Sequence, residues 1–244
     1  MINKDIKNNN GSAYEQRSLF GRQQGRALRG ERAEALNNIL PKIKIPDALL
    51  EKNHKTSPSK LFDKKFENYQ LEIGFGHGER LLELFQSNPD IGYIGAEPFI
   101  NGMANFLKNI PAKQPTENVR VLMDDGMIIA KSLTPNSLDK IFILNPDPWH
   151  KKRHHKRRII NQTNLDIFAT ILRPKGQLIM TSDVPDLAQW MCTQASNHKA
   201  FEWEAKFAED WQIPPKDWIA TKYEKKGAKG AKIMSYLFFE RNSN

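Results

Sequence analysis

Acidic residues recur where short apolar runs end, in positions from which they could jointly bind one positively charged ligand. Five of them lie at or just after successive strand-like runs, and they are Glu72, Glu97, Asp125, Asp147 and Asp183. In a parallel sheet the carboxyl ends of the strands meet at one edge, where ligands bind. The pattern therefore predicts a rim of carboxylates, which suits a cationic cofactor.

A glycine-rich loop precedes the second of these acids. In YQLEIGFGHGERLLELF, the glycines Gly74, Gly76 and Gly78 separate a run with strand alternation from a run with helical spacing. Glycine is expected there because any Cβ would hold a ligand away from the backbone and the helix N-terminus. The dinucleotide fingerprint is G-x-G-x-x-G, whereas here the third glycine comes one residue early. Taken alone, the loop is also compatible with an ordinary tight strand-to-helix turn.

Two glutamates flank the loop and suggest what it binds. Glu72 lies just before the first glycine, and Glu97 ends the next predicted strand. An acid in the latter position can accept hydrogen bonds from both hydroxyls of a ribose. The loop has no basic residue for a pyrophosphate. S-adenosylmethionine, a nucleoside with an amino group and a sulfonium, fits these residues, which favours a methyltransferase over a nicotinamide-dependent dehydrogenase.

The segment NPDPWHKKRHHKRR, Asn145–Arg158, combines a fixed acid with a run of cations. Two prolines restrict the backbone on both sides of Asp147, and Trp149 supplies a flat apolar face beside it. The cations are Lys151, Lys152, Arg153, Lys156, Arg157 and Arg158. Next to the predicted site they indicate phosphate contacts with a nucleic acid, although a solvated face or a localisation signal is the alternative.

The elements that must position these residues alternate between strand and helix from Tyr69 onward. Strands are predicted over 69–73, 91–96, 119–123, 138–144 and 177–181, with helices over 100–109, 127–133, 158–171 and 187–197 and another starting at Glu79. Two later strands, 202–207 and 233–239, have no long helix between them and predict an antiparallel pair at the sheet edge. The pattern indicates an α/β fold.

Three regions are predicted along the chain: a basic N-terminal arm over 1–35, a connector over 36–66 and a catalytic domain over 67–244. The arm carries Arg17, Arg22, Arg26, Arg29 and Arg32, so it is expected to be flexible and either to order against phosphates or to stay a solvated tail. The connector contains three prolines. The length of 244 residues suits one domain with such an extension.

Composition limits the partners and the compartment. Lys and Arg total 37 against 28 Asp and Glu, a net charge of +9 that favours a polyanionic partner. No apolar run approaches the ~20 residues of a membrane span, no signal peptide is visible and Cys192 is the single cysteine, so a cytoplasmic protein is expected. The histidines His150, His154 and His155 lack the spacing and the cysteine partners of a zinc site, so no metal is expected. The oligomeric state, monomer or homodimer, stays open.

Several motifs together resemble one known family. LEIGFGHGE, GAEP, DDG, NPDPWHKKRHHKRR, SDVPDLAQWM and TKYEKKG, in this order, are similar to the bacterial tRNA (guanine-N7)-methyltransferases. The likeness runs from RSLFGRQQGR to FFER, nearly the whole chain, and the PDPWH–basic segment is its most specific part. It implies a Rossmann-like class I methyltransferase fold with a mostly parallel seven-stranded sheet and helices on both faces. It also implies methylation of N7 of a guanine in the tRNA variable loop by S-adenosylmethionine.

The resemblance also implies roles for individual residues. The cofactor's methionine part would contact Glu72, its ribose Glu97 and its adenine Asp125, with the adjacent Asp124 as an alternative, while Asp147 would lie at the reaction centre. Substrate contacts are implied for Lys151, Asp183, Thr221, Lys222, Tyr223 and Glu224. Two positions depart from the family pattern: Asn145 replaces an expected aromatic residue, and Gln23-Gln24 replace arginine. A non-catalytic RNA-binding module is the remaining alternative, and the intact set of acids argues against it.

Overall fold

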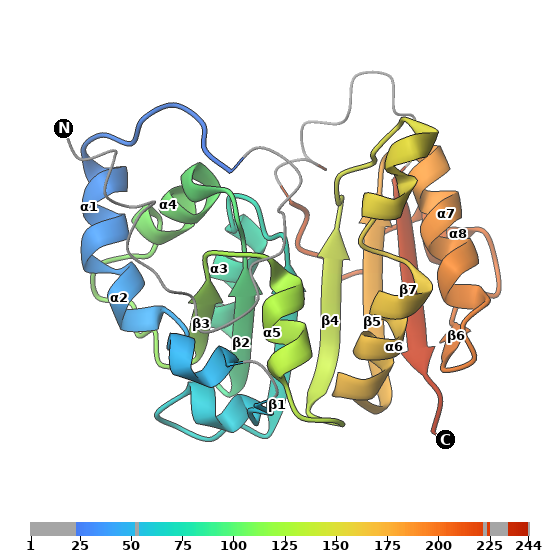
Figure 1. Ribbon diagram of the computed structural model, residues 1–244, viewed down its shortest axis with the longest axis horizontal. Helices are drawn as coiled ribbons and strands as arrows, with labels where there is room; N and C mark the ends of the chain where they lie inside the picture. Colours follow the sequence, from blue (N-terminus) through green and yellow to red (C-terminus); the bar gives the residue numbers. More distant parts are fainter. Residues whose placement is uncertain (1–22, 52–53, 222–223, 225–233, 244) are drawn as a thin grey trace.

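A single twisted sheet organises the structure, a computed structural model that describes residues 23–51, 54–221, 224 and 234–243. In these ranges seven strands run in the order β3-β2-β1-β4-β5-β7-β6 (Figure 1). They are β1 Asn68–Ile73, β2 Ile91–Ala96, β3 Val119–Leu122, β4 Leu138–Leu144, β5 Leu172–Ser182, β6 Phe201–Trp203 and β7 Ser235–Arg241. The first five strands pair in parallel, and β7 is antiparallel to both β5 and β6. The predicted mostly parallel sheet with an antiparallel edge pair is confirmed.

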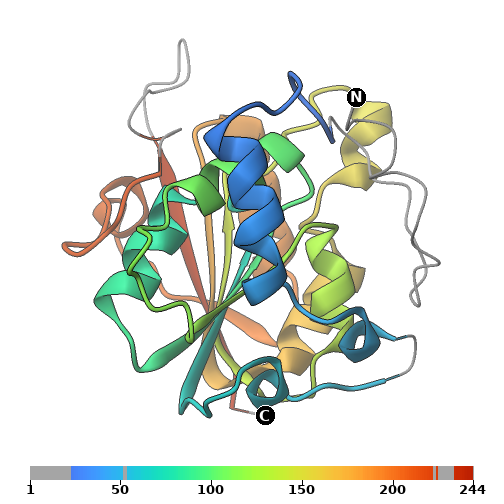
Figure 2. The same cartoon turned by 90° about the vertical axis from the view of Figure 1, so that its left-hand side faces the viewer.

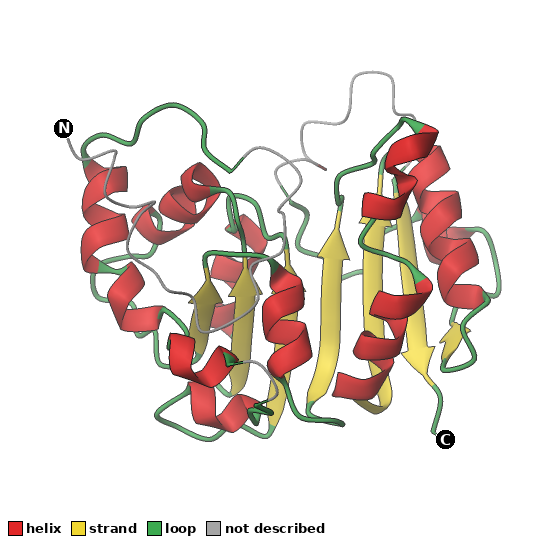
Figure 3. Cartoon of the chain, viewed as in Figure 1, coloured by secondary structure: helices red, strands yellow, loops and turns green. Residues whose placement is uncertain are grey.

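Helices cover both faces of the sheet (Figure 3). The α-helices are α1 Glu31–Asn38, α2 Leu40–Ile43, α3 Glu79–Ser87, α4 Ile100–Lys108, α5 Gly126–Ser132, α6 Gln162–Ile171, α7 Pro185–Ser196 and α8 Glu209–Gln212. Short 3-10 helices are η2 Asp47–Leu50, η3 Pro58–Leu61 and η4 Lys152–Arg157. One cluster of buried apolar side chains joins α1, α3 and α4 to the sheet, and a second joins α5, α6 and α7 to it. The result is the three-layered α/β arrangement expected from the sequence.

The central strands form because their residues are apolar on both faces. In β4, Ile141 and Ile143 face one side of the sheet and are at most 1% exposed, while Phe142 and Leu144 face the other side and are at most 7% exposed. Parallel strands covered by helices on both sides read as such continuous apolar runs. The bounds of β2 and β4 coincide with the predicted ones.

The predicted start of the helix after the cationic run, Arg158, is wrong. The cationic run forms η4, and α6 begins only at Gln162. Asn161 caps α6, since its Oδ1 accepts a hydrogen bond from the Asn164 N–H at 3.1 Å. The basic residues therefore belong to the loop that follows β4, close to Asp147.

The described part of the predicted arm lies on α4. The Gly25 N–H donates to Asn101 Oδ1 at 2.6 Å, and Asn101 Nδ2 donates to the Arg26 carbonyl at 2.8 Å. Helix α1 then packs against α4 and continues past residue 35 into the predicted connector (Figure 2). Arg17 and Arg22 lie outside the described residues, and a flexible basic arm stays a prediction. No helix within the described ranges is long and apolar enough to cross a bilayer.

Candidate functional site

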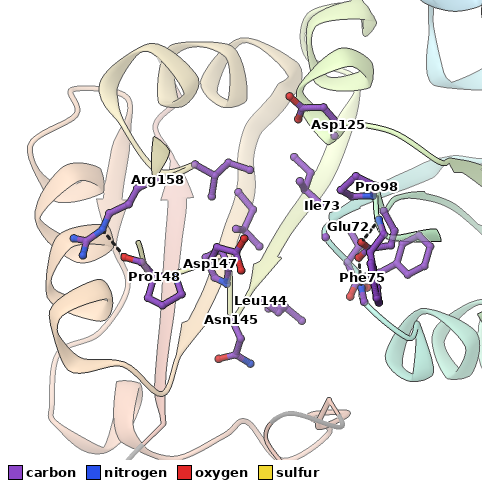
Figure 4. A pocket seen from close by; sticks show the side chains of 18 of the residues that line it. Glu72, Ile73, Phe75, Pro98, Asp125, Leu144, Asn145, Asp147, Pro148 and Arg158 are labelled. Atoms are coloured by element: carbon purple, nitrogen blue, oxygen red, sulfur yellow. Dashed lines mark hydrogen bonds between the residues drawn. The ribbon is translucent and has the colours of Figure 1, made fainter. Parts of the chain in front are cut away.

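A pocket of about 1040 Å³ opens at the carboxyl ends of the central strands. It lies where β1 has β2 on one side and β4 on the other, the point at which the strand order reverses and ligands of such sheets bind. All five acids predicted to form a rim line it: Glu72, Glu97, Asp125, Asp147 and Asp183. In Figure 4, Asp147 and Asn145 lie on one side and Glu72, Phe75 and Pro98 on the other. The topology therefore brings together acids that are up to 111 positions apart in the sequence.

The glycine loop lines this pocket, and its backbone is left-handed there. Gly74 has φ 76° and Gly76 has φ 60°, values that residues with a Cβ rarely adopt. A Cβ on Gly74 would meet no protein atom within 4 Å, so the space beside it belongs to the pocket. Gly78, which caps α3, has another role. A Cβ there would come within 2.5 Å of the Phe106 side chain in α4, so the glycine allows α3 and α4 to pack closely.

Glu97 ties the glycine loop to β2. Its Oε2 accepts the Gly76 N–H at 2.6 Å, and its Oε1 accepts the Phe99 N–H at 2.8 Å. Burial raises the pKa of Glu97 to about 7, with the Asp147 and Glu72 carboxyls adding to the rise and the two N–H donors opposing it. Each oxygen keeps a second lone pair with which it can accept a hydroxyl from a ligand.

Glu72 is not an isolated carboxylate, because Arg80 of α3 neutralises it. Arg80 Nη1 lies 3.2 Å from Glu72 Oε2, and the two side chains are only 6% and 4% exposed. The guanidinium also stacks over Phe142, with 3.9 Å from its carbon to the ring centre, and faces Trp218 at 5.2 Å. Burial raises the pKa of Glu72, and Arg80 opposes that rise. Sequence reasoning missed Arg80, since nothing in a helical run of charged and apolar residues marks one arginine as buried.

Of the two candidate adenine acids, Asp125 faces the pocket. It lines the wall and caps α5, with its Oδ1 accepting the Met127 N–H at 2.9 Å. Asp124 is absent from the wall, and its Oδ1 accepts the Asp125 N–H at 2.7 Å. The geometry supports Asp125 in the predicted position.

The loop that carries Asp147 has an unusual backbone. Asn145 and Trp149 have φ values of 47° and 45°, with Pro146 and Pro148 between them on either side of Asp147. The carboxyl is exposed toward the pocket, yet the surrounding walls remove enough water to raise its pKa. Its fixed backbone makes Asp147 a suitable group for stabilising positive charge that develops in the pocket.

Comparisons with known proteins assign the chain to a family. A family profile described as "Putative methyltransferase" matches residues 67–235. A protein of Rhizobium meliloti named tRNA (guanine-N(7)-)-methyltransferase is 40% identical, over 92% of this chain and 95% of its own length. The chain belongs to the tRNA (guanine-N7)-methyltransferase family. A member from Paramagnetospirillum magneticum is 38% identical over 98% of this chain and 99% of its own length.

Solved structures agree with the family at the level of the fold. The 16S rRNA methyltransferase KamB has a TM-score of 0.53 at 14% identity, covering 72% of this chain and 89% of its own. An antibiotic-related methyltransferase has a TM-score of 0.51 at 18% identity, and the match covers 78% of this chain and 96% of its own. The Rossmann-like methyltransferase fold implied by the sequence motifs is confirmed.

The residues implied as substrate contacts divide into three groups. Asp183 and Thr221 line the pocket. Lys151 is exposed outside the wall, and Glu224 fixes its own segment, with its Oε2 accepting Trp218 Nε1 at 2.7 Å and its Oε1 accepting Thr221 Oγ1 at 3.0 Å. Lys222 and Tyr223 lie outside the described residues. The roles of all six stay predictions.

The cationic run of this family member is not uniform. Lys151, Lys152, Arg153 and Lys156 are exposed, whereas Arg158 is only 2% exposed. Five cations of the run can therefore be considered for RNA, whereas the sixth, Arg158, is buried in the wall of the pocket. Among the described residues there is no group of three or more side chains that could hold a metal ion.

Proposed function

We propose that this chain transfers a methyl group from S-adenosylmethionine to N7 of a guanine in the variable loop of tRNA. The observation that carries the proposal is the pocket in which Glu72, Glu97, Asp125 and Asp147 converge on a left-handed glycine loop, in a chain that belongs to the tRNA (guanine-N7)-methyltransferase family. A cytoplasmic location follows from this substrate.

The residues fit the proposed cofactor. Glu97 would accept the ribose hydroxyls, Asp125 the adenine amino group, and the buried Glu72 the amino group of the methionine part. Gly74 leaves room for a ligand to lie against the backbone. When bound, S-adenosylmethionine supplies an electrophilic methyl group on a positively charged sulfur.

The protein's part in the reaction is orientation and electrostatics. Guanine N7 carries a lone pair and no proton, so no residue has to act as a general base. The purine gains positive charge as its N7 is methylated. The Asp147 carboxylate, at the mouth of the pocket, can accept a hydrogen bond from the guanine amino group and stabilise this charge.

The proposed function is tested by incubating the protein with unmodified tRNA and a labelled methyl donor. The expected product is N7-methylguanosine, recognised by its base-labile ring. A different methylated nucleoside would overturn the assignment. No methyl transfer at all would favour the RNA-binding module instead.

Cofactor affinity should depend on pH through Glu97. The pKa of this carboxyl is about 7 in the free protein, and hydroxyl donors favour its ionised form, so binding should release a proton. Affinity then falls as pH drops below 7, to about tenfold weaker at pH 6 than at pH 8. Calorimetry of S-adenosylhomocysteine binding in buffers of different ionisation enthalpy measures both effects. Glu97→Gln is the control that should abolish the pH dependence of binding. If the affinity of the wild-type protein did not change between pH 6 and pH 8, the prediction would be contradicted.

The exposed cations should set the salt dependence of tRNA binding. Neutralising Lys151, Lys152 or Arg153, all of which are exposed, should reduce the slope of log affinity against log salt by about 0.7–0.9. Cofactor affinity should not change, since none of the three lines the pocket. Lys60→Gln, on a distant 3-10 helix, serves as the control. If the slope is the same in all these variants, the run is a solvated face.

A further inference from the structure

Arg158 is engaged on three sides inside the protein, although it ends a run of surface cations. Its Nε donates to the carbonyl of Pro148 at 3.0 Å (Figure 4), and its Nη2 bonds to the Asp186 carboxylate. Its guanidinium carbon lies 5.1 Å from the ring centre of Trp190. Asp186 and Trp190 both belong to α7, so Arg158 links the Asp147 loop to that helix.

The carbonyl that Arg158 holds occupies a critical place in this loop. It belongs to the peptide between Pro148 and Trp149, one residue after Asp147 and directly before the left-handed φ of 45° at Trp149. A bulky residue adopts that conformation only where its surroundings impose it. The ring of Trp149 is itself held, with the Arg157 guanidinium 5.0 Å from its centre and His154 at 5.9 Å. Without the bond to Pro148, the backbone around Trp149 could relax and carry Asp147 with it.

We propose that Arg158 is a positioning residue for methyl transfer, which acts by fixing the loop of Asp147 against α7. The inference rests on the proposed function and adds a residue to its machinery. The planar guanidinium bonds a carbonyl and a carboxylate in two directions while its face stacks on an indole. A lysine has one compact charged group and cannot make this set of contacts.

A double-mutant cycle tests the proposal with single-turnover rates on tRNA at saturating cofactor. Arg158→Lys should slow the wild-type reaction by about 10- to 10²-fold, as expected for a small misplacement of a reacting group. In the Asp147→Asn background the same substitution should slow it by no more than about twofold, because the group that Arg158 positions is already neutral. Equal losses in the two backgrounds would overturn the proposal.

Matched variants separate positioning from stability and from RNA contact. Arg120 is also buried, pairs with Asp63 at 2.9 Å, bonds the Val119 carbonyl at 2.9 Å and lies 5.2 Å from the Phe62 ring centre, away from the pocket. Arg120→Lys should lower the melting temperature without slowing methyl transfer at a temperature where it stays folded. A rate loss in Arg120→Lys as large as in Arg158→Lys would overturn the proposal. Arg158→Gln tests for RNA contact. If it reduced the slope of log tRNA affinity against log salt by about 0.7–0.9, Arg158 would contact a phosphate and the proposal would be overturned.

If Arg158→Lys does not fold, Asp186→Asn carries the same test. This substitution removes the carboxylate that orients Arg158 from the exposed start of α7. It should slow methyl transfer by about tenfold at most in the wild-type background and by no more than about twofold in the Asp147→Asn background. Equal losses of rate in the two backgrounds would again contradict the proposal. A wild-type protein with no activity on tRNA would instead refute the proposed function. The two failures are therefore distinguishable.

Discussion

Replacing Asp147 with asparagine should slow methyl transfer by about 10²–10³-fold, the usual effect of removing one fixed electrostatic group from an active site. The carboxylate lies in the pocket between two prolines, and asparagine keeps its shape while removing its charge. Affinity for S-adenosylhomocysteine should change little, because that molecule lacks the sulfonium. The measurement is the single-turnover rate at saturating tRNA and cofactor.

The pH dependence of that rate tests whether the ionised form of the Asp147 carboxyl is needed for methyl transfer. The pKa of Asp147 is raised by partial desolvation, so the rate should fall in acid as the carboxyl protonates and should be flat near neutral pH. Saturating cofactor is needed because Glu97, with a pKa of about 7, makes cofactor binding itself pH-dependent. A wild-type rate that stays flat into acid, or an acid-side fall that persists unchanged in Asp147→Asn, would contradict this role of the Asp147 carboxylate.

The fold was predictable because its strands and turns carry strong local signals. The apolar runs of β2 and β4 end at residues that break strands, and their bounds coincide with the predicted ones. The start of the helix that follows the cationic run was harder to predict, because nothing in the sequence marks Arg158 as buried. Helix α6 begins at Gln162 rather than at the predicted Arg158, because the Arg158 side chain is buried and Asn161 caps the helix.

The acids of the site were predictable from topology, but their partners were not. Once the strands are parallel, residues at their carboxyl ends must share one edge, and all five predicted acids line the pocket. Arg80 and Arg158 are buried, although each directly follows a partly exposed charged residue, Glu79 and Arg157 respectively. One sequence does not distinguish an arginine paired inside the protein from one in solvent. Only contacts in the folded chain make this distinction. Arg80 pairs with Glu72, which is 8 residues away in the sequence, and Arg158 pairs with Asp186, which is 28 residues away.

The Glu72–Arg80 pair is expected to show the largest effect on stability. Both side chains are at least 94% buried, and the guanidinium is the partner that offsets the cost of burying the Glu72 carboxylate. Removing one member of a buried ion pair leaves an uncompensated charge, which costs about 3–5 kcal/mol of folding free energy. Arg80→Met, which keeps much of the side-chain volume over Phe142, should therefore destabilise the protein by about this amount at pH 8.

The loss in Arg80→Met should depend on pH in a direction set by Glu72. Burial already raises the pKa of this carboxyl, and without Arg80 the pKa in the folded state moves further above the value of about 4.3 in the unfolded chain. The folded state then holds a proton that the unfolded state releases, so stability falls as pH rises from about 4 through the folded-state pKa. Urea unfolding at pH 5 and pH 8 should show the larger deficit at pH 8. Adding Glu72→Gln to Arg80→Met should remove this pH dependence and recover part of the stability. If Arg80→Met alone were as stable as the wild type at pH 8, Arg80 would not be needed to bury the Glu72 carboxylate.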